Sequence, residues 1–150
     1  MSIRDVAADA YREAAPALVA STLGGLFAGV VLSGMRAELR LVPGLLVCVP
    51  ALLATRGNVY GSLGARLATG LHQGLIEAEF EADDRLVAAG AAAMANGLVA
   101  SAFAAALAFC VLLALGRTVA GLGTLVAVAL VAGLLSGVVL TGAVVAVVFV

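Results

Sequence analysis

Residues 50–77, with the sequence PALLATRGNVYGSLGARLATGLHQGLIE, decide how this chain is read. The segment begins and ends like a membrane helix, yet it contains two arginines, an asparagine, a histidine and five glycines. Polar and ionisable groups are costly in hydrocarbon, so their presence within a long apolar segment requires a structural explanation.

The rest of the chain is strongly apolar. Hydrophobic residues make up 64% of its 150 residues and charged residues only 11%, and the mean hydropathy is +1.21. About 20 residues cross a hydrocarbon core of roughly 30 Å, so the chain has room for four or five spans. The composition predicts an all-α, polytopic transmembrane helical bundle, a multi-pass protein of the cell membrane surrounded by the lipid bilayer.

The charge balance and the motifs exclude several functions. Eight basic and nine acidic residues give a net charge of -1, so no nucleic-acid partner is expected. Tyr60 stands where the first glycine of a G-x-S-x-G protease motif belongs, and the sequence contains no His-Glu-x-x-His. We therefore expect neither an enzyme nor a bound cofactor.

The apolar runs predict one membrane domain over residues 1–150, with four spans. A polar lead-in occupies about residues 1–15, and Pro16 is placed at a helix start, where its missing N–H costs nothing. The second apolar run is too long for one straight span and contains Pro50, so we expect a break there, with a helix beginning at about Pro50. The predicted spans are 16–34, 41–76 with this break, 86–115 and 119–150.

On a helix, the polar residues of the opening segment fall on one face. They recur every three or four residues, which is the spacing of one side of an α-helix. We call them the polar stripe: Thr55, Asn58, Ser62, Arg66, Thr69, Gln73 and Glu77. Such a face predicts either a water-filled path or hydrogen bonds to neighbouring helices.

Small residues predict where helices pack closely. Gly57, Gly61 and Gly64 lie opposite the polar stripe, and Gly57 and Gly61 form a GxxxG pair that lets two backbones approach. Gly133 and Gly137 form a second GxxxG pair in the last span. We expect helix packing at all five glycines.

The chemistry of the polar stripe suits a hard cation. Its amide and hydroxyl oxygens are ligands of the kind that Mg²⁺ takes, and Mg²⁺ gives up its water reluctantly. The expected ion pathway therefore runs along Thr55, Gly57, Asn58, Ser62, Thr69 and Gln73. Arg66 would repel a cation there, which predicts that it pairs with a carbonyl or carboxylate. His72, the one histidine, is expected near the membrane interface.

Two stretches resemble a known family. The sequences PALLATRGN at residues 50–58 and GARLATGLHQG at residues 64–74 resemble the signature of the MgtE-like divalent cation transporters. They are most similar to the branch that includes the animal solute-carrier magnesium transporters. The matching residues are Pro50, Ala51, Leu52, Leu53, Arg56, Gly57, Asn58, Arg66, Leu67, Thr69 and Gly74, whereas Ala68 replaces the usual serine.

The resemblance implies a repeat of five membrane helices that works in pairs around a central cation pore. It implies that Gly57 and Asn58 line this pore, with Asn58 as a metal contact. Family members continue into a fifth helix with an intramembrane aspartate, and this sequence stops at Val150 before such a segment, so that helix is expected to be missing.

Taken together, the residues and the resemblance predict transport of Mg²⁺ or another divalent cation. The mechanism expected is permeation of a partly hydrated ion, and the partner expected is a second copy or second repeat of the same domain, as in a homodimer. The alternative is a non-transporting membrane scaffold or accessory subunit in which the polar stripe only joins helices. Another ion, such as Co²⁺, Zn²⁺ or Na⁺, stays open as the substrate.

Overall fold

The computed structural model describes residues 3–74 and 84–148, which form helices and short connections without a strand. The chain divides into two units, Met1–Leu41 and Val42–Val150. The first contains helix α1, Ile3–Gly34, and the short helix α2, Arg36–Arg40. The polar lead-in is helical from Ile3 onward. Pro16, which was predicted to stand at a helix start, lies inside α1 instead.

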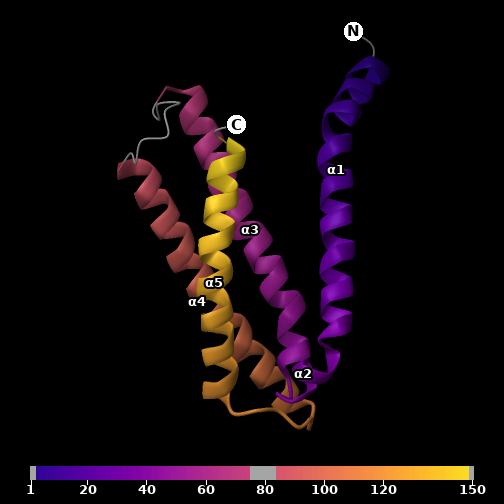
Figure 1. Ribbon diagram of the computed structural model, residues 1–150, viewed down its shortest axis with the longest axis vertical. Helices are drawn as coiled ribbons and strands as arrows, with labels where there is room; N and C mark the ends of the chain where they lie inside the picture. Colours follow the sequence, from indigo (N-terminus) through magenta and orange to yellow (C-terminus); the bar gives the residue numbers. More distant parts are fainter. Residues whose placement is uncertain (1–2, 75–83, 149–150) are drawn as a thin grey trace. The chain divides into compact units, whose positions relative to one another are not determined.

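The second unit is a bundle of three helices (Figure 1). Helix α3 spans Leu45–His72, α4 spans Asp84–Ala114 and α5 spans Leu122–Val148. Each helix of the unit packs against both of the others, and the chain runs up, down and up through them. The architecture is thus all-α, as predicted.

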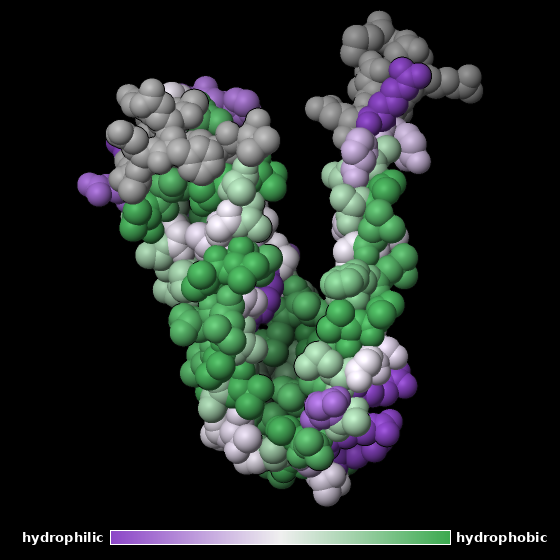
Figure 2. Space-filling view, in the orientation of Figure 1, coloured by the Kyte–Doolittle hydropathy of each residue, from purple (hydrophilic) through white to green (hydrophobic). Residues whose placement is uncertain are grey.

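Three helices within the described residues are long and apolar enough to cross a membrane: Ala14–Gly34 within α1, Asp84–Ala114 and Leu122–Val148. Apolar side chains cover the visible surface of α5 along most of its length (Figure 2). Helix α3 is not among the three, although its 28 residues would extend about 42 Å at 1.5 Å per residue. Its polar residues lower its hydropathy, and they are the residues that require a function.

The expected break at Pro50 is absent. Helix α3 begins at Leu45 and continues through Pro50 to His72. Pro50 is the sixth residue of the helix, so its missing N–H removes one backbone hydrogen bond near the helix start. The start is instead set by Gly44, whose φ of 98° is unfavourable for other residues.

A backbone contact joins the two connections at one end of the bundle. The amide of Ala120 donates a hydrogen bond of 2.8 Å to the carbonyl of Pro43. Gly44 lies beside it, where a Cβ atom would approach the side chains of Leu112 and Val119 to 3.0 Å. The entry to α3 is therefore held against the connection between α4 and α5.

The bundle has two apolar clusters. The first includes Cys48 and Leu52 of α3 together with alanines of α4 and α5, and the second is built around Tyr60, Leu63 and Leu67. Between Leu52 and Tyr60, one turn from each, lies Arg56. A polar residue therefore separates the two halves of an otherwise apolar core.

Candidate functional site

Helix α3 presents one face to α4 and α5 and another to the outside of the unit. The packed face consists of Cys48, Leu52, Tyr60, Leu63, Leu67 and Gly70. Tyr60 and Leu67 are only 4% and 2% exposed. The helix is thus anchored by its apolar side.

The polar stripe lies away from this packed face. Thr55 is half-buried, and the other described members are exposed: Asn58, Ser62, Arg66, Thr69 and Gln73. Gln73 follows the last helical residue as its C-cap. The stripe's last member, Glu77, lies outside the described residues. The structure therefore brings six polar side chains, five of them exposed, to one side of α3 and its end.

The hydroxyl groups of the stripe are turned back to their own helix. Thr55 donates to the carbonyl of Leu52 at 3.0 Å, Ser62 to that of Val59 at 2.8 Å and Thr69 to that of Ala65 at 2.8 Å. Each hydroxyl has a single proton, which these bonds use. The oxygen lone pairs that remain can only accept, so this side of α3 offers oxygen acceptors to water or to a cation.

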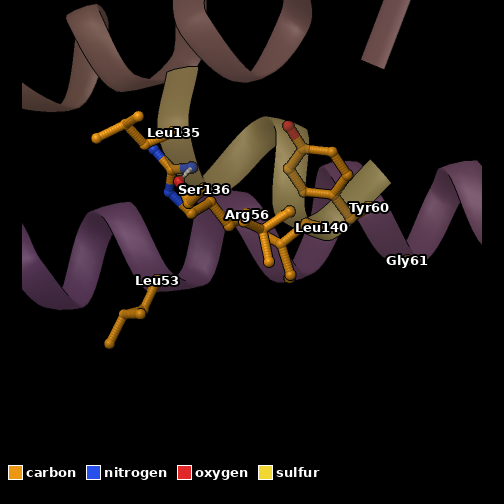
Figure 3. A pocket seen from close by; sticks show the side chains of 9 residues that line it. Leu53, Arg56, Tyr60, Gly61, Leu135, Ser136 and Leu140 are labelled. Atoms are coloured by element: carbon orange, nitrogen blue, oxygen red, sulfur yellow. Dashed lines mark hydrogen bonds between the residues drawn. The ribbon is translucent and has the colours of Figure 1, made fainter. Parts of the chain in front are cut away.

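Arg56 has a different environment, which the periodicity of the stripe does not reveal. Its guanidinium donates hydrogen bonds to the Gly133 carbonyl at 3.2 Å and to the hydroxyl oxygens of Ser136 and, at 3.2 Å, Ser101. Figure 3 shows the side chain reaching from α3 to Ser136 of α5. Ser101 is fully buried on α4. One arginine thus joins all three helices.

The glycines differ in what surrounds them. A Cβ atom on Gly133 would lie 3.3 Å from the Arg56 guanidinium and from the Ser101 hydroxyl, and one on Gly137 would lie 2.7 Å from the Tyr60 hydroxyl. Gly64 is in ordinary contact distance of Val144, at 3.6 Å. Gly57 and Gly61 have no such neighbour within 4 Å.

Gly57 and Gly61 instead line an open groove of about 670 Å³ between α3 and α5. Figure 3 looks into this groove, whose other lining residues include Leu53, Leu135 and Leu140. Its lining residues with polar groups are Arg56, Tyr60 and Ser136. The groove is a largely apolar surface, unlike the polar stripe.

Arg66 lines a smaller cavity between α3 and α4. The cavity has a volume of about 60 Å³, and Ser62 and Asn96 also contribute to it. A cavity that holds a water molecule needs roughly 10–15 Å³ and two or more polar partners, so this one is suited to ordered water. Asn96 is exposed on α4. The polar surface of α3 therefore continues onto α4 at this level.

Charged metal ligands are not gathered in the described part of the chain. Residues 3–74 and 84–148 contain no group of three or more His, Cys, Asp or Glu that would hold a metal ion. His72 is exposed at the last turn of α3. The described polar groups of the polar stripe are amides, hydroxyls and the Arg66 guanidinium.

Comparison with known proteins adds an independent finding. A family model described as "MgtE: Divalent cation transporter" matches residues 49–150. The match covers α3, α4 and α5 apart from the first turn of α3, and so includes the polar stripe and the residues that bond to Arg56. No curated protein and no solved structure matches the chain.

Proposed function

Because the chain belongs to the MgtE family of divalent cation transporters, we propose that it carries Mg²⁺ across the cell membrane along the polar stripe of α3. The pathway residues proposed are Thr55, Gly57, Asn58, Ser62, Thr69 and Gln73, with Asn58 as a metal contact. The family supports divalent cation transport, and the stripe supports this route.

The observation that carries the proposal is the orientation of the hydroxyl groups. Thr55, Ser62 and Thr69 use their protons within α3, which leaves oxygen lone pairs on its exposed side. Oxygen acceptors are the ligands that hard cations take, and they also accept hydrogen bonds from the water around such an ion. These hydroxyl oxygens therefore suit a cation better than an anion, although Arg66 on the same face opposes a cation.

The ion is expected to keep part of its water. Mg²⁺ dehydrates reluctantly, and the described stripe offers no carboxylate that would replace its hydration shell. Neutral oxygens contact a hydrated ion through its water molecules. The membrane potential then supplies the driving force, about 2.3 kcal/mol per elementary charge for each 100 mV.

One exposed helix face forms only one side of a pathway. A polar face of a spanning helix is unfavourable against lipid, so it requires water or protein opposite. We propose that α3 is a fourth spanning helix and that a second copy or second repeat supplies the other wall. The pathway then lies at the contact between the two copies or repeats.

Ion flux in proteoliposomes tests the proposal. The purified chain is reconstituted and challenged with Mg²⁺, Co²⁺, Zn²⁺ and Na⁺ in turn. We expect divalent flux, its loss in Asn58→Ala and its retention in Val99→Ala, a matched change at an exposed apolar position of α4. Normal Mg²⁺ flux through a folded Asn58→Ala protein would contradict the assignment of Asn58, and the absence of divalent flux would contradict the function.

A scaffold or accessory subunit is the alternative, favoured by the open groove at Gly57 and Gly61. Such a groove suits the close approach of another helix. If the chain is a scaffold, substitutions at these glycines disrupt assembly, and no ion crosses the membrane in any variant.

A further inference from the structure

The position of Arg56 bears on the direction in which the polar stripe of α3 faces. Arg56 lies in the middle region of α3, Ser101 in that of α4, and Gly133 and Ser136 in that of α5. All three helices are long enough to span a bilayer, so the four groups meet far from either membrane surface. At that depth a guanidinium has little access to water.

Apart from Tyr60, which lies between Gly97 of α4 and Gly137 of α5, the other contacts of α3 fix its rotation less firmly than Arg56 does. Apart from Leu125, the buried residues of α4 and α5 in the two apolar clusters are alanines: Ala93, Ala104, Ala105, Ala108 and Ala129. Larger residues such as Leu140 and Val144 are only partly buried beside them. Between helices in a membrane there is little hydrophobic driving force, because lipid is as apolar as the side chains. A largely alanine surface penalises other rotations of α3 only weakly, so Tyr60 and Arg56 are the contacts that oppose them most.

The hydrogen bonds of Arg56 make one rotation of α3 more favourable than the others. In the observed orientation its guanidinium reaches three acceptors on two helices. If α3 turned by about 100°, one residue step, the guanidinium would leave these acceptors for lipid or for the apolar clusters. A buried charge without hydrogen-bond partners is strongly unfavourable.

The acceptors are themselves held in place. Ser101 donates its own proton to the Gly97 carbonyl at 2.7 Å, and Ser136 donates to the Ala132 carbonyl. Their oxygens are therefore directed as acceptors toward Arg56. Gly133 leaves room for the arrangement, because a Cβ there would lie 3.3 Å from both Arg56 and Ser101.

Asn58 and Arg56 are two residues apart, which places them about 200° apart around the helix. Fixing Arg56 toward α4 and α5 consequently fixes Asn58, Ser62 and Thr69 on the outer side. We propose that Arg56 is a positioning residue, whose hydrogen bonds to Ser101, Gly133 and Ser136 set the rotation of α3 and so the direction in which the polar stripe faces. The importance of this direction for transport rests on the proposed function.

Thiol accessibility tests the rotation without requiring transport. Single reporters are introduced as Ser62→Cys on the exposed side and Leu63→Cys on the packed side, in the full chain in lipid nanodiscs. The exposed thiol of Cys110 is first removed by the change Cys110→Ser, whereas the buried Cys48 is retained. With Arg56 present, the Ser62→Cys reporter should react with a charged methanethiosulfonate at least tenfold faster than Leu63→Cys.

Removing the guanidinium should reverse or abolish this preference. In Arg56→Gln we expect the Ser62→Cys rate to fall and the Leu63→Cys rate to rise, so that their ratio drops about tenfold, with a smaller drop in Arg56→Lys. General loosening would raise both rates and would overturn the proposal. Arg117→Gln, a matched change in the connection between α4 and α5, should leave the ratio unchanged.

If Arg56→Gln does not yield folded protein, a second variant tests whether the hydrogen bonds of Arg56 set the rotation of α3. The double change Ser101→Ala and Ser136→Ala removes two acceptors and keeps the charge, and it should lower the ratio severalfold. An unchanged ratio in this variant, or in folded Arg56→Gln, would overturn the proposal. Since the ratio reports geometry alone, an absence of ion flux would count only against the proposed function.

Discussion

The hydroxyl oxygen of Tyr60 on α3 lies 2.7 Å from the point where a Cβ atom would stand on Gly137 of α5. The same hydroxyl is 3.4 Å from the corresponding point on Gly97 of α4. Tyr60 is thus inserted between two glycines of two helices, one turn of α3 beyond Arg56. At Gly137 this close packing leaves no room for an added methyl group.

Gly137→Ala should therefore destabilise the bundle. Real Cβ atoms do not approach an oxygen to 2.7 Å, so either Tyr60 or α5 must move, and overpacking of this kind costs about 1–3 kcal/mol. We expect a lower midpoint of thermal unfolding in detergent, measured by the reaction of buried Cys48 with a thiol dye in the Cys110→Ser background. The effect should be smaller when Tyr60→Phe is also present, because the obstructing hydroxyl is then gone.

Gly142→Ala is the matched control on the same helix. A Cβ atom at Gly142 would meet nothing within 4 Å. Alanine is favoured over glycine within a helix by roughly 0.5–1 kcal/mol, so this change should raise the unfolding midpoint slightly or leave it alone. Equal destabilisation by both substitutions would show that the Tyr60 contact is not the cause.

The sequence predicted most of the helices because long apolar runs and their polar boundaries are strong signals. It placed the last two spans at 86–115 and 119–150, and the structure has α4 at Asp84–Ala114 and α5 at Leu122–Val148. The helix starts predicted at Pro16 and Pro50 were wrong. A proline was taken to mark a helix start, whereas Pro16 and Pro50 both lie within helices, which tolerate the loss of single backbone bonds.

The candidate site was only partly predictable. Periodicity groups residues on one face, and so it found the polar stripe, but it cannot say which face packs against neighbours. Arg56 falls outside the stripe, and its hydrogen bonds are to Ser101 and Ser136, which are 45 and 80 residues away in the chain. A serine near the middle of each of two apolar spans was the available signal.

Cross-linking should detect the second copy that the proposed pathway needs. If the polar stripes of two copies face each other, Ser62→Cys in the Cys110→Ser background should form a disulfide-linked dimer on mild oxidation in membranes. Val99→Cys, at an exposed apolar position of α4, should form much less. Equal yields at the two positions would indicate random collision, and no dimer at Ser62→Cys or at Thr69→Cys would contradict pairing through the stripe.

Arg66 should limit the rate at which cations pass. It is exposed on the polar stripe and lines a cavity of about 60 Å³ with Ser62 and Asn96, where the described residues include no carboxylate. A positive charge beside the proposed path repels a divalent cation, so Arg66→Gln should increase divalent flux roughly threefold to tenfold at low ionic strength. Added monovalent salt should reduce the difference, because it screens exposed charges.

Arg66→Lys keeps the charge and should behave like the unmodified protein. A fall in flux in Arg66→Gln that Arg66→Lys does not share would mean that the charge assists transport, contrary to this prediction.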